Sequence, residues 1–397
     1  MFAAFNLRAT IAAVSPVLPQ VERSYRLSSA GGGLLNTAPL VCFGVFALAT
    51  PALLRRFGDD RLLWLAVAGV TAGTVLRSLP GAFPLFAGTL VAGAAIGVGN
   101  VLLPGLVKRS FPDRVALLTG LYAMALSGGA AVAAGLTVPI EHAAGLSLRT
   151  ALGVWAIPAL AALVLWPPGR SKRAPTRERG GPWLGGAWPA LRRSGLAWAV
   201  TGFMGLQSLS FYALFAFVPT LLESAGDRAA LAGAELSVSA VAGLLSALAT
   251  PHLAGRLRRG WPPVAAGIAL NALALAGLAV APHGVGAVTV WMFALGAGQG
   301  AMISLALGFI VARAPDPVQA ANLSTMAQGG GYLLASLGPF AVGALHQLTG
   351  GWRVPLGVLG AVLVAEAVAG FAASVKRTVP GVPGVPGVPG VRPVAGR

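Results

Sequence analysis

Residues 83–107 read FPLFAGTLVAGAAIGVGNVLLPGLV and contain no charged side chain. Roughly 20 apolar residues in a helix cross the hydrocarbon core of a bilayer, so this stretch is long enough to span a membrane. The rest of the chain has a similar character, because 56% of its 397 residues are hydrophobic and only 10% are charged. This composition excludes an ordinary soluble domain of the same length and indicates a membrane protein.

Eleven further apolar runs of similar length lie on either side of this stretch, and most connections between the runs are short. The sequence therefore predicts an all-α membrane protein with twelve transmembrane helices. The expected spans are 2–21, 31–54, 62–79, 83–107, 115–139, 149–167, 196–222, 231–254, 262–281, 284–311, 320–345 and 354–375.

The distribution of Lys and Arg predicts how the spans are oriented. The net charge of +17 would suggest a nucleic-acid partner in a soluble protein, but here the cations form short clusters between apolar runs, and we expect no such partner. The even-numbered connections and the C-terminal tail carry most of the cations. Because positive residues stay on the cytoplasmic side, we expect a multi-pass protein of the inner (cytoplasmic) membrane with both termini in the cytoplasm. The opposite side has only Arg23, Arg26, Arg77, Arg149, Arg228 and Arg353, and Arg8 alone is assigned to the interior of a span.

The chain divides into two predicted six-helix bundles, 1–167 and 196–375. The connection 168–195 is basic, rich in Pro and Gly and without apolar periodicity, so we expect a flexible cytoplasmic linker. Residues 376–397 include four Val-Pro-Gly repeats and are expected to form an extended, disordered cytoplasmic tail.

An internal repeat supports the division into two halves. The string ALATP occurs at Ala47–Pro51 and again at Ala247–Pro251, each time at the end of the second span of its half and before an Arg-rich loop. Two similar halves related by an axis along the membrane normal form a pseudo-symmetric pair of bundles.

Several kinds of site are excluded by composition. A single cysteine, Cys42, cannot form a disulfide framework, and there is no Cys/His cluster for a metal, so we expect neither a metal nor a cofactor. No Gly-Lys-Ser/Thr loop is present for ATP. The acidic residues are scattered, which disfavours an integral membrane enzyme that would need acidic metal ligands.

The loop Pro51–Arg61 resembles the signature loop of the major facilitator superfamily. Arg56, Gly58 and Arg61 match the superfamily pattern, but Pro51 and Arg55 stand where the pattern has Gly and Asp. The Asp-centred contact between halves that this loop makes in the superfamily is therefore not carried over to this chain.

Segments along almost the whole chain resemble one branch of that superfamily, the cyanate and 2-nitroimidazole transporters. The resemblance implies a secondary transporter that moves a small anion or small polar solute, such as cyanate, nitrate or nitrite, by alternating access. It leaves open uptake or extrusion, and a wider drug-efflux carrier of the same fold remains an alternative. The matching segments are Asn6-Leu-Arg8, Gly99-Asn-Val-Leu-Leu-Pro104, Lys108-Arg-Ser-Phe-Pro-Asp-Arg114, Thr119-Gly-Leu-Tyr-Ala-Met124, Gly205-Leu-Gln-Ser208, Phe211-Tyr212, Gly298-Gln-Gly300, Met326-Ala-Gln-Gly-Gly-Gly-Tyr332 and Gly338-Pro339.

The resemblance also implies which spans line the cavity, namely 1, 2, 4, 5, 7, 8, 10 and 11. Polar side chains at mid-membrane depth are costly, so each needs a neighbour or a solute. A ring of amides and phenols around one Arg suits a small anion. Each amide could instead bond between helices, and each Tyr could act as a gate or packing residue. The candidates for substrate binding are Asn6, Arg8, Asn100, Tyr122, Gln207, Tyr212, Gln299, Gln328 and Tyr332.

We expect Arg8 to be the principal ligand, because its guanidinium can grip an anion with two parallel donors. Alternatively, Arg8 pairs with a backbone carbonyl or reaches the cytoplasmic interface. Only five residues precede Asn6, so we expect either that the natural start lies upstream or that the first span begins short, near the inner interface.

Acidic residues bear on energy coupling. Glu366 is the one carboxylate that we place deep in a span, and it is a candidate for carrying a proton, although it lies on an outer helix. Glu235 and His252 are expected near the two interfaces. Proton symport, uniport and anion exchange all remain open. We expect the protein to act as a monomer in the bilayer, with a small molecule and in one version protons as its partners.

Overall fold

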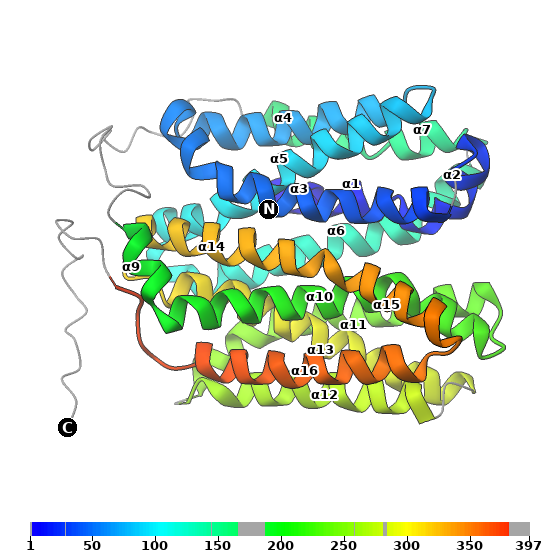
Figure 1. The fold of residues 1–397 in the computed structure, drawn as a ribbon. Coiled ribbons are helices and arrows are strands. Elements are labelled where there is room, and N and C mark those ends of the chain that lie inside the picture. Colours follow the sequence, from blue (N-terminus) through cyan, green and yellow to red (C-terminus); the bar gives the residue numbers. More distant parts are fainter. Residues whose placement is uncertain are drawn as a thin grey trace.

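The computed structural model describes residues 2–27, 29–143, 145–165, 187–257, 259–280 and 284–380. Over these residues every regular element is a helix, which confirms the expected all-α fold. Within these ranges, nine of the expected spans are each a single long helix (Figure 1): α3 (Ser29–Phe57), α4 (Asp59–Arg77), α5 (Ala82–Ser110), α6 (Val115–Ala143), α10 (Gly195–Ser224), α11 (Ala229–Arg256), α12 (Trp261–Val280), α13 (Val285–Ala312) and α16 (Arg353–Ala373).

The remaining three expected spans are interrupted helices. In the first span, Pro16 has no N–H to donate to the carbonyl of Ala12, the residue at which α1 ends. The pieces are α1 (Phe2–Ala12), η1 (Ser15–Val17) and α2 (Leu18–Tyr25) in the first span, α7 (Leu148–Gly153) and α8 (Ala156–Leu165) in the sixth, and α14 (Pro317–Ala335) and α15 (Leu337–Thr349) in the eleventh.

In the described part of the chain, nine helices are long and apolar enough to cross a membrane. The first and eleventh spans are not among the nine, whereas the divided sixth span, Leu148–Leu165, is one of them. The helix α4 falls short because its 19 residues begin with Asp59, Asp60 and Arg61 and end with Arg77. Packing against neighbours compensates for lower hydropathy: α4 lies along α5, and α14 packs on α3, α5 and α10.

The two ends of the bundle differ in charge. In the described residues, several helices end in clustered cations at the end where α9 is drawn in Figure 1, and we call it the basic end; these cations include Arg55, Arg56, Arg192, Arg193 and Arg256. The other end, which we call the opposite end, holds α2 and α7 (Figure 1).

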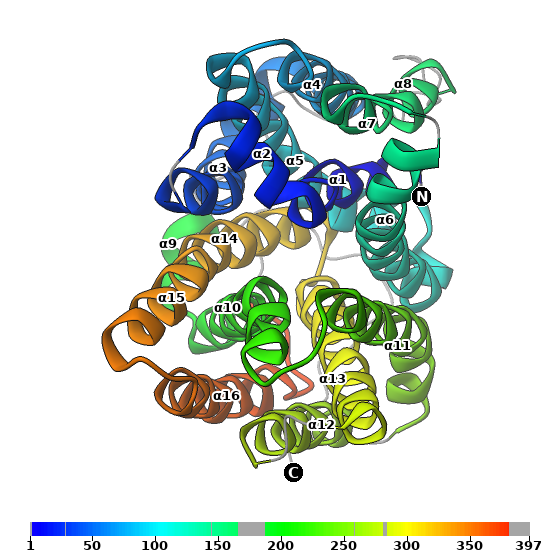
Figure 2. The same ribbon diagram turned by 90° about the vertical axis from the view of Figure 1, so that its right-hand side faces the viewer.

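Two groups of helices are visible from the opposite end: α1–α8 form one and α10–α16 the other (Figure 2). They meet along two seams, where α14 packs on α3 and α5 and where α11 packs on α6. Glycines allow close approach at both seams. A Cβ on Gly44 of α3 would lie 2.9 Å from the carbonyl oxygen of Gly329 of α14, and one on Gly120 of α6 would lie 3.0 Å from Pro251 of α11.

Part of the expected linker is ordered. Residues Ala187–Arg193 form the short helix α9, which packs on α10 and α14 with Leu191 fully buried. The prediction of a flexible linker is therefore wrong for these residues, because one buried leucine holds a helix too short to show apolar periodicity. Residues 166–186 lie outside the described part of the chain.

The start of the expected disordered tail is also ordered. Val379 is 2% exposed, and its N–H donates to the carbonyl oxygen of Arg313 at 2.8 Å. The side chain of Gln319 donates to the carbonyl oxygen of Pro380. The prediction of disorder is therefore wrong for residues 376–380, while residues 381–397, with most of the Val-Pro-Gly repeats, lie outside the described residues.

Candidate substrate site

Arg8 lies near the middle of the bundle's long axis. α1 packs on α6, and a Cβ on Gly129 would overlap the carbonyl oxygen of Phe5. Gly129 is at the centre of α6, which has 29 residues, so about 20 Å of helix lies on either side of it. Arg8 is three residues further along α1, or about 4.5 Å toward the opposite end. At this depth the guanidinium is far from both ends of the bundle, which argues against the alternative that it reaches an interface.

Aromatic side chains of the other helix group cover the guanidinium. The Cζ atom of Arg8 lies 5.3 Å from the ring centroid of Tyr212 and 5.8 Å from that of Phe211, both on α10. Such cation–π contacts contribute roughly 0.5–2 kcal/mol. Arg8 therefore joins α1 to α10 across the boundary between the two groups.

Among the residues that the structure describes, no carboxylate is found to interact with Arg8. The ionisable groups that interact with it electrostatically are the phenols of Tyr212, Tyr332 and Tyr122. Within the described chain, neither the buried Nε of Arg8 nor the hydroxyl of Tyr212 makes a hydrogen bond of good geometry. Since the hydroxyls of Tyr212 and Tyr332 both lie within hydrogen-bonding reach of the guanidinium, the site holds a positive charge surrounded by phenols.

Asn100 is the centre of a polar cluster on the side of Arg8 that faces the basic end. The hydroxyl of Tyr122 donates to Oδ1 of Asn100, and Nδ2 of Asn100 donates to the hydroxyl of Tyr332, both at 3.4 Å. The side chain of Gln328 donates to the Asn100 carbonyl at 2.6 Å and to Ser324 at 2.7 Å. These bonds link α5 and α6 to α14 of the other group, and the two at 3.4 Å are long and weak.

Three other predicted site residues are not seen to contact Arg8. Asn6 donates to the carbonyl oxygen of Pro158 on α8 at 3.0 Å, which is a bond within its own helix group. Gln207 donates to Met204 and Ser208 of its own helix. Gln299 on α13 is 7% exposed, with a buried Oε1 that has no hydrogen-bond partner in the described chain. Arg8, Tyr212, Tyr332, Tyr122, Asn100 and Gln328 are the predicted residues that the structure brings together.

Glu366 is fully buried on α16, behind α10 as seen from Arg8. The hydroxyl of Ser210 lies 3.5 Å from its Oε2, and its Oε1 has no hydrogen-bond partner among the described residues. Ser210 and Tyr212 are two residues apart on a helix and so point to nearly opposite faces. Glu366 and Arg8 are therefore on different sides of α10.

Two buried charged residues were missed in the sequence. Glu235, expected near an interface, is 3% exposed and accepts a hydrogen bond of 2.6 Å from the hydroxyl of Thr289. Glu366 is thus not the only buried carboxylate. Arg77, assigned above to the surface opposite the cytoplasmic side, is 1% exposed and donates to the carbonyl of Thr10. That carbonyl lies in the last turn of α1, where helical donors are missing. The signal for Arg77 was its place inside the expected span 62–79.

The described residues contain no group of three or more His, Cys, Asp or Glu side chains that could hold a metal ion. The candidate site itself offers a guanidinium, phenols and amides, which bind a solute by charge and hydrogen bonds.

The fold is that of a multi-pass membrane transporter. A family model described as Major Facilitator Superfamily matches residues 1–335, and the chain belongs to that superfamily. This confirms the expected twelve-helix architecture. A solved structure of a proton:xylose symporter, bound to 6-bromo-6-deoxy-D-glucose, has the same fold: its TM-score is 0.75 at 13% sequence identity, over 95% of both chains.

Two relatives from Escherichia coli cover most of the chain. The 2-nitroimidazole transporter is 38% identical over 378 residues, which are 93% of this chain and 93% of that protein. The cyanate transport protein is 26% identical over 348 residues, which are 87% of this chain and 88% of that protein. Both names agree with the branch that the sequence segments resemble.

Proposed function

We propose that this protein carries a small anion across the cytoplasmic membrane by alternating access and that Arg8 is its principal ligand. The observation that carries the proposal is the guanidinium of Arg8 near mid-membrane depth, with tyrosines rather than a carboxylate around it. Placing an Arg at the centre of a membrane helix costs at least roughly 2.5–3.5 kcal/mol on insertion scales. An anion that binds there offsets this cost.

The remaining shell comes from both helix groups. Tyr212 offers a buried hydroxyl with no hydrogen bond of good geometry, and the bonds of Asn100 to Tyr122 and Tyr332 are long enough for a solute to replace them. Because these residues belong to different groups, a rocking movement of one group against the other changes the shell on each cycle. Asn6, Gln207, Gln299 and Gln328 are assigned to the outer part of this shell or to bonds between helices.

The orientation follows from charge. We assign the basic end to the cytoplasm, because Lys and Arg accumulate in cytoplasmic loops. The bilayer is then the inner membrane, both termini are cytoplasmic, and the two bundles are 1–167 and 196–375, joined through 168–195. We expect the carrier to act as a monomer, with proton symport, uniport and exchange as the possible modes.

A second candidate is export of a neutral nitroaromatic compound. It is favoured by the aromatic pair Phe211 and Tyr212 beside Arg8, and by the name of the 2-nitroimidazole transporter, which is the more similar of the two relatives. In this version the rings bind the solute by stacking and Arg8 binds its nitro group.

Uptake into proteoliposomes by the wild type and two Arg8 variants tests the proposal. The solutes are cyanate, nitrate, nitrite and 2-nitroimidazole, each with and without a pH gradient. Arg8→Lys keeps the charge and loses the planar fork, so anion binding should weaken in part, and Arg8→Gln should abolish anion transport. Arg228→Gln, an exposed cation at the opposite end, is the control. Unchanged affinity for the identified anion in purified Arg8→Gln would refute the role of Arg8, whereas transport of 2-nitroimidazole alone favours the second candidate.

A further inference from the structure

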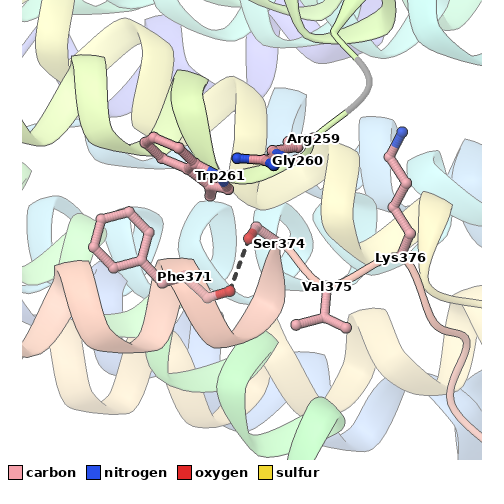
Figure 3. Close-up of a pocket in the computed structure, with 7 residues that line it drawn as sticks. All are labelled: Arg259, Gly260, Trp261, Phe371, Ser374, Val375 and Lys376. Atoms are coloured by element: carbon pink, nitrogen blue, oxygen red, sulfur yellow. Dashed lines mark hydrogen bonds between the residues drawn. The ribbon is translucent and has the colours of Figure 1, made fainter.

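A pocket opens between two outer helices at the basic end, away from the Arg8 site. It lies where α12 begins and α16 ends and has a volume of about 570 Å³. Helices α12 and α16 pack on each other at the edge of their group (Figure 2). Seven residues line the pocket (Figure 3): Arg259, Gly260, Trp261, Phe371, Ser374, Val375 and Lys376.

The lining combines two cations with two aromatic rings. Arg259 and Lys376 are exposed, and no carboxylate is among the lining residues. Trp261 is 46% exposed and Phe371 41%, although both are large and apolar. Figure 3 shows the two rings on one side of the pocket and Lys376 on the other, with Arg259 between them above Ser374.

Close backbone packing and hydrogen bonds fix the inner wall of the pocket, which is formed by Gly260 and the end of α16. A Cβ on Gly260 would overlap the carbonyl oxygen of Ser374, so only glycine lets the loop approach the end of α16 so closely. Arg313 donates from Nε to the carbonyl of Ala373 at 2.9 Å and from Nη2 to that of Ser374 at 3.0 Å. The hydroxyl of Ser374 donates to the carbonyl of Phe371 at 2.7 Å, the dashed line in Figure 3. Arg313 therefore neutralises the negative end of α16 and adds a third positive charge behind the wall.

We propose that this pocket binds the phosphate headgroup of an anionic membrane phospholipid. Arg259 and Lys376 contact the phosphate, and Trp261 and Phe371 lie against the glycerol and the first part of the acyl chains. Basic pockets between transmembrane helices on the cytoplasmic side suit anionic headgroups, and aromatic rings prefer this depth of a bilayer. A soluble phosphate would use the cations but leaves the two exposed rings without a partner, which is why the lipid is the better occupant. The inference uses the orientation proposed above but not the identity of the transported solute.

Fluorescence quenching by brominated lipids tests the inference without any substrate. The protein is reconstituted into phosphatidylcholine with increasing fractions of brominated phosphatidylglycerol, and separately of brominated phosphatidylcholine. The chain has nine tryptophans, so the signal of Trp261 is taken as the part of the quenching that is absent in Trp261→Phe. We expect the lipid at Trp261 to be preferentially phosphatidylglycerol, and the preference to fall roughly fivefold for each cation removed in Arg259→Gln and Lys376→Gln.

Two further variants separate the pocket from general surface charge. Arg228→Gln combined with Arg353→Gln removes two exposed cations at the opposite end and should leave the preference unchanged. Val375→Phe fills the pocket without changing the charge and should lower the preference. An unchanged preference in Val375→Phe or in the Arg259→Gln, Lys376→Gln double variant would overturn the inference, as would an equal loss in the control. Competition by millimolar glycerol 3-phosphate would show a soluble phosphate ligand instead of the lipid.

Discussion

The Nζ atom of Lys108 on α5 donates a hydrogen bond of 2.9 Å to the carbonyl oxygen of Val311 on α13, and it also donates to the carbonyl of Ala314. The Val311 carbonyl is in the last turn of α13, where carbonyls lack helical donors and carry partial negative charge. Asp316, which caps the start of α14 through Gln319, also interacts electrostatically with Lys108. One ammonium group therefore joins the two helix groups at the basic end.

The signature loop of the superfamily does not account for this contact between the two helix groups. In the last turn of α3, Arg55 stands at the position of the acidic residue of that pattern, so an Asp-centred contact cannot form there. The bond from Lys108 closes the basic end by a different route, between the C-terminal ends of α5 and α13. For the transporter to open at this end, the bond must break.

Replacing Lys108 by Met should shift the protein toward a conformation open at the basic end. A hydrogen bond from a charged donor contributes about 1.5–3 kcal/mol, so the equilibrium should shift about tenfold or more. Spin labels at Ser110 and Leu257, exposed at this end in the two groups, report the separation by pulsed EPR in a Cys42→Ala background. Arg256→Met, which removes another cation from the same end, should leave the distances unchanged. Equal distance distributions in wild type and Lys108→Met would contradict the prediction.

Two substitutions at Tyr212 separate its ring from its hydroxyl. Tyr212→Phe keeps the ring near Arg8 and removes the hydroxyl that makes no good hydrogen bond, so affinity for an anion should fall up to about tenfold with little change in stability. Tyr212→Leu also removes the cation–π contact and should lower both affinity and thermal stability. Substrate affinity by calorimetry and unfolding temperature by intrinsic fluorescence check both effects. If Tyr212→Phe matches the wild type in affinity, the hydroxyl is not a ligand.

The helices were predictable because most spans are apolar over long runs, as in α13. The breaks were less so. Pro16 and Pro339 each lack the N–H that would bond to the residue at which the preceding helix ends, Ala12 or Ala335. Pro104, however, lies inside the unbroken helix α5, so a proline alone does not mark a break. A run that is apolar on all sides has no period that marks the side of the helix facing its neighbours.

The same limit explains which site residues could be predicted. Arg8, Asn100 and Tyr212 were recognisable as polar residues inside apolar runs, where such residues are costly. The direction in which each side chain points could not be predicted, and Asn6 in fact donates a hydrogen bond to α8. The burial of Arg77 depends on a contact with Thr10, more than sixty residues away, which is made only after the two helices have packed.

Glu366→Gln should leave substrate binding intact. Glu366 lies across α10 from Arg8, so it does not touch a solute bound there, and Gln has nearly the same shape. Substrate counterflow without a pH gradient should therefore match the wild type within about twofold. Uptake driven by a pH gradient is measured in the same vesicles, since a loss of that activity alone would identify Glu366 as a coupling residue. Ser210→Ala is the matched control, because it removes the hydroxyl beside Glu366 and leaves the carboxylate in place. Abolished counterflow in Glu366→Gln would show that the carboxylate belongs to the binding site.

Gly129→Ala should displace α1 and with it Arg8. The added Cβ would overlap the backbone oxygen of Phe5, which cannot rotate away as a side chain could, so α1 must shift from α6. Overpacking of this kind typically costs 1–3 kcal/mol, which exceeds the gain of up to about 1 kcal/mol in helix propensity when Gly becomes Ala.

Gly135→Ala is the matched control, because it lies on the same helix with no atom within 4 Å of the new Cβ and receives the same gain in propensity. We expect Gly129→Ala to lower the unfolding temperature and to weaken substrate affinity about tenfold, because ligands act only when held close to their working geometry. Gly135→Ala should match or slightly exceed the wild-type unfolding temperature and keep its affinity. Equal behaviour of the two variants would mean that α1 is not held against α6 at Phe5, and the depth assigned to Arg8 would then lose its support.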